Sequence, residues 1–423
     1  MRRITRAGAV LATGLAAVTV LAGCGSAGTA AGPPAVSAAQ LRASVTRAYL
    51  FLDEMMDRHA TGPVPRLVQS FAGGALGRQG FTASETYDDA LVIDAYLAAG
   101  NPAATARAEV IGNGLLYVQA HDQQHDGRVR AAYAPTPLRS PADVTVDSAA
   151  SLAGNMAWAG LALARLYAVT GRSAYLTGAE NIGNWVQAHC RDTRGPGGYT
   201  GGQNAGGQKI EWKSTEHNID LYALFSMLAA QTRNPAWAAR AAWARFFVAS
   251  MWDPRQGRFY VGTTTDGFTP NDQYLPEDVN SWSYLALRAS RYQASVSWDV
   301  ANLAVSTAGH PGVSACRGDR NGVWYEGTAH LADALEFRGA PGDAARARGY
   351  LATLYYAQAG GPGAGHRGII AASRNGLRDC DGGTYSNSLH TGTTAWYILA
   401  VRKVDPFAVM SPARPGASAA PAN

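Results

Sequence analysis

The feature that most constrains the fold is a repeated pair of helical segments. In each pair an apolar segment ends at a short Gly, Asn or Pro turn and an Ala/Arg-rich segment follows, as at residues 88–119, 155–187 and 218–250. The apolar members recur at a spacing of roughly 50 to 70 residues, which is typical of a structural repeat. They are centred near Ala90, Trp158, Leu221, Tyr284, Leu331 and Trp396.

The number and character of these segments predict an all-α fold. About twelve helices are expected, beginning near Ala38, Ser84, Pro102, Thr145, Arg172, Ser214, Pro235, Glu277, Ser295, Glu326, Pro341 and His390. A helix that is apolar nearly all round must be buried, while an amphipathic partner can cover it. Six such pairs closed into a ring make an (α/α)6 barrel, and an open helical solenoid is the alternative. Long loops with small β-hairpins, such as residues 257–262, are expected on one face.

The two ends of the chain differ from this body. Arg2, Arg3 and Arg6 precede a short apolar stretch ending in Leu21-Ala22-Gly23-Cys24, which resembles the lipobox of bacterial lipoproteins. Residues 1–24 are therefore predicted to be a signal peptide, with Cys24 the lipidated residue; an ordinary secretory signal is the alternative. We expect a flexible tether at 25–37, the body at 38–404 and a disordered tail at 405–423. The predicted location is extracytoplasmic, either anchored to the membrane by lipid or secreted.

Composition excludes some partners. With 47% hydrophobic residues the chain has ample material for a core. The formal charge of +5 includes three arginines of the leader, and no basic run alternates with aromatic residues, so nucleic acid is not an expected partner. We expect a monomer.

Cysteine usage fits an exported protein. Besides Cys24 the chain has Cys190, Cys316 and Cys380, an odd number. The last two both lie in Gly/Asp-rich loops, so they are the preferred disulfide, which leaves Cys190 as a buried thiol. No Cys-x-x-Cys or closely spaced His pair suggests zinc, and we expect no metal and no cofactor.

Acidic and aromatic residues gather where the inner helices are predicted to begin. If the barrel forms, these residues converge on one end of the ring although they are far apart in sequence. Capping of free helical N–H groups explains single acids and hydroxyls, but it does not explain why aromatic residues lie beside these acids. Rings stack on sugars while carboxylates bind hydroxyls and move protons. The candidate binding residues are Tyr87, Asn155, Trp212, His217, Asn218, Glu277, Trp282, Trp324, Tyr325 and His390.

Over residues 38–404 the chain resembles the six-hairpin glycosidase-like superfamily of (α/α)6-barrel carbohydrate-active enzymes. The resemblance rests on the helical pairs, on acids at inner-helix starts, and on two blocks at residues 324–328 and 389–396. It implies a glycoside hydrolase that acts on a poly- or oligosaccharide, a glucan in our prediction, and that inverts the anomeric centre.

Inversion needs a protonated carboxyl on the leaving oxygen and an ionised one that activates water. Glu216 lies beside His217 within the longest Gly-rich loop, so we predict that it is the acid. Asp88 heads an inner helix next to Asp89, and one of the two is predicted to be the base. Asp278 and Glu326 compete for either role.

Three alternatives remain open. A polysaccharide lyase would use a His or Tyr base and a cation to neutralise a uronate; the candidates are His217, Tyr325 and His390 with Lys209, Lys213 and Arg288. A sugar epimerase of this barrel relies on paired histidines and is usually cytoplasmic, which the leader contradicts. A glycan-binding lipoprotein would keep the aromatic residues and lack a working acid/base pair.

Overall fold

The computed structural model describes residues 35–360 and 366–410. The predicted signal peptide, Cys24, the tether up to residue 34 and the tail from residue 411 lie outside the described residues. Within them, no helix combines the length and the apolar character needed to cross a membrane.

Helices dominate the described residues. They are α1 (Ala38–Asp57), α2 (Gly74–Arg78), α3 (Thr86–Ala98), α4 (Pro102–Ala120), α5 (Ala153–Thr170), α6 (Ser173–His189), α7 (Thr215–Thr232), α8 (Pro235–Ser250), α9 (Asp278–Leu287), α10 (Gln293–Asn302), α11 (Tyr325–Arg338), α12 (Asp343–Gly360) and α13 (Thr391–Arg402). Eleven of the twelve predicted starts lie within two residues of an observed one. The exception is Thr145: the following residues pair as a strand, so α5 begins only at Ala153.

Short antiparallel strands occupy the loops between helices. They are β1 (Phe71–Ala72), β2 (Ser84–Glu85), β3 (Ala132–Tyr133), β4 (Val146–Ser148), β5 (Ser151–Leu152), β6 (Gly202–Gln203), β7 (Lys209–Ile210), β8 (Trp252–Asp253), β9 (Arg258–Phe259), β10 (Gly262–Thr263), β11 (Pro270–Asn271), β12 (Ala304–Thr307), β13 (His310–Val313), β14 (Ile369–Ile370), β15 (Leu377–Arg378), β16 (Thr384–Tyr385) and β17 (Leu389–His390). They pair as two- and three-stranded sheets, among them β1-β17-β14 and β15-β16. The hairpin predicted at 257–262 forms instead between β8 and β9.

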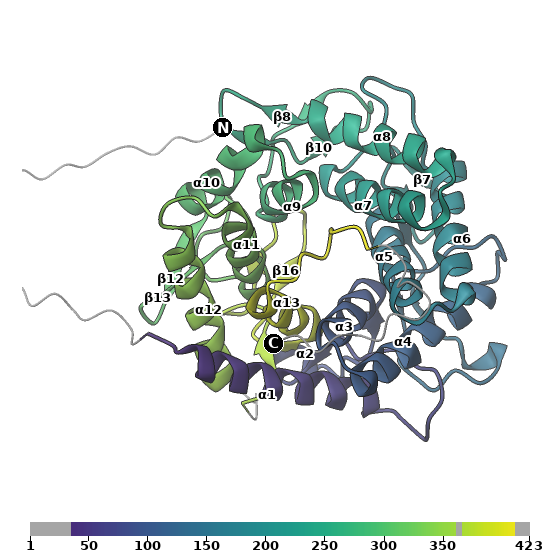
Figure 1. Cartoon of the computed structure of the whole chain (residues 1–423), viewed down its shortest axis with the longest axis horizontal. Helices are drawn as coiled ribbons and strands as arrows, with labels where there is room; N and C mark the ends of the chain where they lie inside the picture. Colours follow the sequence, from purple (N-terminus) through teal and green to yellow (C-terminus); the bar gives the residue numbers. More distant parts are fainter. Residues whose placement is uncertain (1–34, 361–365, 411–423) are drawn as a thin grey trace, which may run out of the picture. The chain divides into compact units, whose positions relative to one another are not determined.

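Six helices form a closed inner ring (Figure 1). Each of α3, α5, α7, α9 and α11 contacts the next one in chain order, and α13 contacts both α11 and α3. The helices α4, α6, α8, α10 and α12 pack against the inner helix that precedes them, and α1 covers α13. The predicted all-α (α/α)6 barrel is confirmed, and the open solenoid is wrong because α13 closes the ring.

One hydrogen bond recurs in all six repeats and joins each to the next. The N–H group at the start of an inner helix donates to a carbonyl of the loop that leads into the following inner helix. The six bonds run from Thr86 to Ala131, from Ala153 to Gly201, from Thr215 to Val261, from Glu277 to Ala315, from Tyr325 to Ala371 and from Thr391 to Ser70. They use N–H groups that a helix cannot satisfy internally, and the last one closes the circle.

A second recurring hydrogen bond involves the residue three positions after each of these N–H donors. It accounts for the polar side chains of Asp89 and Asn218 at that position. Asp89 accepts the N–H of Val68 at 2.8 Å, and Asn218 accepts that of Tyr199 at 2.9 Å. The corresponding acceptor is Met156, Asn280, Thr328 or Thr394 in the other repeats. Asp89 and Asn218 therefore hold loops in place, while their predicted roles as catalytic and binding residues stay predictions.

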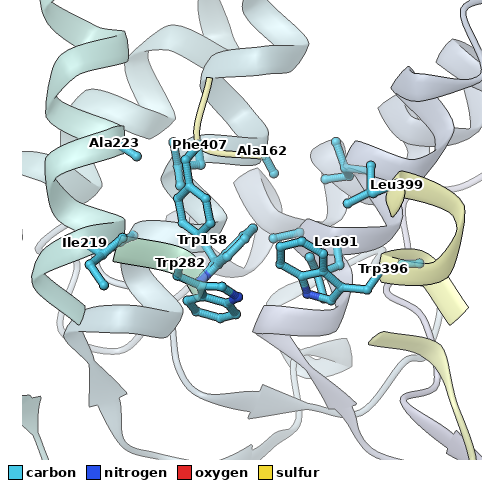
Figure 2. Packing of buried hydrophobic residues seen from close by; sticks show 14 of the residues in the cluster. Leu91, Trp158, Ala162, Ile219, Ala223, Trp282, Trp396, Leu399 and Phe407 are labelled. Carbon is cyan, nitrogen blue, oxygen red and sulfur yellow. The ribbon is translucent and has the colours of Figure 1, made fainter. Parts of the chain in front are cut away.

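Aromatic residues fill the axis of the barrel (Figure 2). Trp158, Trp282 and Trp396 come from three inner helices, and their ring centroids lie 5.3 to 6.0 Å apart. Phe407 packs against Trp158 at 5.4 Å and against Trp282 at 5.5 Å, from the side of the segment that follows α13. Asp405 in that segment pairs with Arg288 at 2.5 Å. The ordered body thus continues through Phe407, and the tail predicted from residue 405 begins too early.

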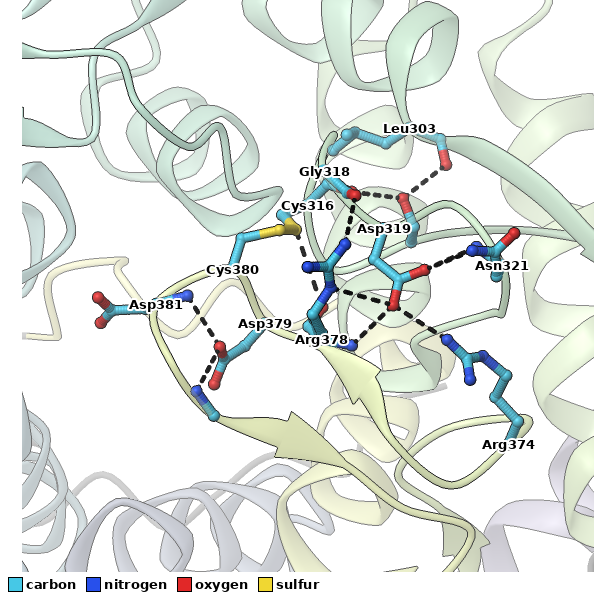
Figure 3. The surroundings of a disulfide bond; sticks show 12 residues. Leu303, Cys316, Gly318, Asp319, Asn321, Arg374, Arg378, Asp379, Cys380 and Asp381 are labelled. Atoms are coloured by element: carbon cyan, nitrogen blue, oxygen red, sulfur yellow. Dashed lines mark hydrogen bonds and ion pairs between the residues drawn. A yellow bond between two sulfur atoms is a disulfide. The ribbon is translucent and has the colours of Figure 1, made fainter. Parts of the chain in front are cut away.

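The preferred disulfide between Cys316 and Cys380 is present, and Cys190 is a buried free thiol as predicted. The bond joins the loop before α11 to the β15–β16 hairpin (Figure 3). Asp319 braces the same junction: its carboxylate accepts from the backbone N–H of Arg378 at 3.1 Å and pairs with Arg374 at 3.0 Å.

Replacing both Cys316 and Cys380 with serine is expected to lower the free energy of unfolding by about 2–4 kcal/mol, because the unfolded chain regains the entropy of a long loop. Chemical denaturation measures the difference. A thiol reductant should bring the native protein to the same value and leave the double variant unchanged. A native protein whose stability does not respond to reduction would contradict this prediction.

Candidate functional site

A cavity of about 510 Å³ opens where α7, α9 and α11 begin. Of the predicted site residues it brings together Trp212, Glu216, His217, Asp278 and Trp324. The remaining wall comes from three loops, and it includes Gly262 to Thr265, Tyr274, Asp379, Asp381 and Tyr385. The predicted convergence of residues from distant parts of the chain on one end of the ring is therefore observed.

The aromatic residues of the cavity are fixed by ring contacts. Trp324 stacks on Tyr385 with centroids 5.2 Å apart, and Trp212 lies 5.7 Å from His217 at a tilt of 50°. Trp212 is half-buried, whereas Trp324 is almost fully buried. Preformed rings of this kind can stack on a sugar without first losing conformational entropy.

Glu216 and Asp278 are the half-buried carboxyls of the cavity that inner helices supply. Ser214 caps α7 through its hydroxyl, which accepts the N–H of His217 at 3.2 Å, so Glu216 is not needed as a cap. Burial raises the pKa of Glu216 well above its ordinary value, and the charge of Asp278 adds to the rise. Burial and the charge of Glu277 raise the pKa of Asp278 to about 7.

Behind the cavity, five side chains form a buried chain of alternating charge. Asp88 lies 3.3 Å from His390, and His390 lies 3.3 Å from Glu326. Glu326 lies 3.8 Å from His330, which contacts Glu277 at 3.0 Å. All five are at most 4% exposed. We call them the carboxylate–histidine chain.

The carboxylates raise the pKa of both histidines of this chain. Burial would lower the pKa of His330, but Glu277 and Glu326 outweigh it and raise the value to about 9. Asp88 and Glu326 likewise raise the pKa of His390 well above its usual range, against the effect of burial. Burial would raise the pKa of Glu326, yet its two histidine partners hold it well below the ordinary value. The chain is thus a set of mutually compensated charges.

The other predicted binding residues take different places. Tyr87 supports the carboxylate–histidine chain: its hydroxyl donates to Glu326 at 2.7 Å and accepts from Trp396 at 2.8 Å. Trp282 belongs to the axial core, and Tyr325 is buried in the main core. Asn155 is half-buried on the first turn of α5. For Trp282, Tyr325 and Asn155 the described contacts give no direct role at the cavity.

Sequence reasoning missed several residues of the site. His330 lies four residues after Glu326 and Asp220 four after Glu216, so each is on the helix face of a predicted acid. Asp220 is fully buried, and burial together with the charge of Glu216 raises its pKa well above the ordinary value. Asp381 and Tyr385 gave no comparable signal, because the disulfide-linked hairpin brings them to the cavity from outside the helical repeat. Within the described residues no group of three or more His, Cys, Asp or Glu side chains is arranged to hold a metal ion.

No protein-family model matches the sequence, and no curated protein matches it either. Solved structures do match in fold. A D-mannose isomerase is 14% identical, with 87% of this chain and 97% of that chain covered and a TM-score of 0.62. A cellobiose 2-epimerase from Bacillus thermoamylovorans B4167 is 10% identical, with 87% of this chain and 99% of that chain covered and a TM-score of 0.64. An α-1,6-mannanase of Salegentibacter sp. HEL1_6, solved as an inactive variant with α-1,6-mannotriose, is 12% identical. The match covers 88% of this chain and 99% of that chain, with a TM-score of 0.56. At these identities the likeness establishes the fold alone, an (α/α)6 barrel shared with these carbohydrate-active enzymes.

Proposed function

We propose that the protein is a glycoside hydrolase that cleaves an O-glycosidic bond in an oligo- or polysaccharide. The observation that carries the proposal is the pairing of Glu216 and Asp278 in one cavity between aromatic walls. A protonated carboxyl and an ionisable one on opposite sides of a bound sugar are what an acid/base hydrolysis requires. The mannanase among the structural neighbours supports the same chemistry on this fold.

In this proposal Glu216 donates a proton to the leaving oxygen and Asp278 activates water. Glu216 is suited to the first role because burial and the charge of Asp278 raise its pKa well above the ordinary value, which favours the protonated form. Asp278 replaces Asp88 as the base. Asp88 is fully buried against His390, so it has no surface on which to hold a water molecule. Glu326 is confined to the carboxylate–histidine chain in the same way.

The cations that the lyase alternative requires are paired with carboxylates of the protein. Lys213 is buried in an ion pair with Asp192, and Arg288 at the C-terminal end of α9 pairs with Asp405. Lys209 is exposed and lies 4.0 Å from Glu211. None of these three offers a free positive charge to a uronate.

A sugar epimerase or isomerase is the second candidate, because His330 and His390 lie on neighbouring inner helices and both contact Glu326. Two of the structural neighbours carry such activities. Removal of a carbon-bound proton needs a neutral base, however, and both histidines are buried beside carboxylates that raise their pKa, which favours the charged form. This argument favours the hydrolase.

The pH profile of glycan cleavage is expected to be bell-shaped. Asp278 must be ionised to act as base, so the rate should rise as the pH passes about 7. Glu216 must stay protonated, so the rate should fall once the pH exceeds its raised pKa. An Asp278→Asn protein should lose activity across the whole range and not merely on the acid limb. A profile that is flat from pH 5 to 9 would contradict these roles.

Digestion of a panel of glycans by the purified protein tests the reaction class. New reducing ends without ultraviolet absorbance indicate a hydrolase, and absorbance from an unsaturated uronide indicates a lyase. An unshortened sugar whose C-2 configuration has changed indicates an epimerase. The proposal fails if any outcome other than the first is obtained.

A further inference from the structure

The wall of the cavity carries acids but no free cation. Of the described residues that line it, Glu216, Asp278, Asp379 and Asp381 are acidic, and Lys213 is the single lysine or arginine. The Lys213 ammonium group is wholly buried, lies 3.3 Å from Asp192 and donates to the carbonyl oxygens of Arg194 and Gly197, each at 2.7 Å. Its charge is compensated inside the wall, so the cavity presents a net negative surface.

An uncharged imidazole lies on the same wall. His217 lines the cavity and is 9% exposed, and its Nδ1 has no hydrogen-bond partner among the described residues. Burial lowers the pKa of His217 to about 4, so the ring is uncharged at neutral pH. The ring therefore adds no positive charge to the cavity wall and leaves its acids uncompensated from this side.

Asp381 reaches the cavity from the disulfide-linked hairpin (Figure 3). One oxygen of Asp379 accepts the N–H groups of Asp381 and Gly383, at 2.8 and 2.9 Å, which fixes the turn between β15 and β16. Cys380, in the same turn, is bonded to Cys316. The hairpin thus holds the exposed carboxyl group of Asp381 at the cavity wall, near enough to Glu216 for its charge to help raise the pKa of Glu216.

We propose that the sugar bound in this cavity carries a positive charge, as an unacetylated amino sugar does. The inference rests on the proposed hydrolase function and specifies its substrate class. A free ammonium group donates three hydrogen bonds and pairs with carboxylates, and the half-buried ring of Trp212 can contact a cationic sugar. A uronate would meet a wall whose single described cation is already paired with Asp192, and a neutral sugar would desolvate the carboxyl groups of Asp278, Asp379 and Asp381 without compensation.

Binding by the Glu216→Gln protein tests the inference without turnover. Glucosamine oligosaccharides, in β-1,4 and β-1,6 linkage, are compared by calorimetry with N-acetylated and glucose oligomers of equal length. We expect at least one glucosamine series to bind about tenfold more tightly than both counterparts, with the difference shrinking as salt is raised. Equal binding of the three sugars, a preference for a neutral one, or no binding of either glucosamine series would overturn the inference.

A variant of Asp381 tests whether the preference for glucosamine depends on a carboxylate of the cavity wall. Asp381→Asn, made in the same Glu216→Gln background, should weaken binding of the glucosamine oligomer about tenfold and leave that of the glucose oligomer unchanged. Asp272→Asn is the control, because Asp272 is an exposed carboxylate on the loop that carries Tyr274 and is not among the residues that line the cavity. Equal losses for both sugars, or for both variants, would count against a charge-specific site.

Digestion by the native protein separates the two proposals. Cleavage of neutral and amino-sugar glycans at similar rates would overturn the substrate inference and leave the hydrolase intact. Selective binding of glucosamine oligomers with no cleavage of any glycan would overturn the hydrolase and keep the cationic ligand.

Discussion

The Glu216→Gln protein is expected to cleave its glycan more slowly than the native protein by a factor on the order of 10² to 10⁴. Glutamine keeps the size and much of the hydrogen bonding of the side chain but cannot donate the proton. Stability should change by no more than about 1 kcal/mol, because Ser214, and not Glu216, caps α7. Initial rates and a denaturation curve of the same preparation measure both quantities.

The leaving group provides a sharper criterion. An aryl glycoside with a leaving group of low pKa needs little protonation, so the Glu216→Gln protein should cleave it far better than the natural glycan. Asp278→Asn should show no such rescue, because water must still be activated. Glu211→Gln, an exposed neighbour in the preceding loop, should retain the native rate. If Glu216→Gln is fully active and Asp88→Asn or Glu326→Gln is inactive, the roles assigned here are wrong.

Glu326→Gln is expected to cost about 3–5 kcal/mol of unfolding free energy, because it removes the central anion of a buried charge chain. His330 and His390 lie 3.8 and 3.3 Å from this carboxylate, and both would keep a proton with one partner fewer. Glu336→Gln is the matched control: it lies ten residues further along α11, in an exposed pair with Lys403, and should cost less than about 1 kcal/mol. Urea denaturation of the two variants measures the contrast.

The pH dependence of stability follows from the same chain. The lowered pKa of Glu326 adds stability that is present above its unfolded value and is lost as the pH falls through the folded one. The raised pKa of His330 adds stability that is fully present below about pH 6.5 and is lost as the pH rises through about 9. Glu326→Gln should therefore reduce the fall in unfolding free energy that the native protein shows as the pH is lowered. If Glu326→Gln lowers the unfolding free energy at pH 7 by less than about 1 kcal/mol, the carboxylate–histidine chain contributes little to stability.

The ring and the place of the site could be predicted from sequence because both follow from periodic features. Burial of the apolar helices at Trp158, Tyr284 and Trp396 dictates an inner layer, and acids that head successive inner helices must meet at one end of it. Glu216 and Asp278 became candidates in this way.

The roles of individual acids could not be predicted, because adjacent positions on a helix face different surroundings. Asp88 and Asp89 are neighbours in sequence, yet one pairs with His390 and the other accepts the N–H of Val68. Exposure of a carboxyl depends on which loop covers it. The contribution of Asp381 depends on a disulfide whose effect on the cavity wall is not encoded in any periodic pattern.

Proton NMR of a cleavage reaction in D₂O tests the acid/base hydrolysis most directly, with whichever glycan of the panel the protein acts on. The account predicts that the chain is shortened, that the first product released has the anomeric configuration opposite to that of the cleaved bond, and that C-2 keeps its proton. Deuterium at C-2 of an unshortened sugar would show that the reaction removes a carbon-bound proton instead of cleaving a glycosidic bond, and would contradict the account.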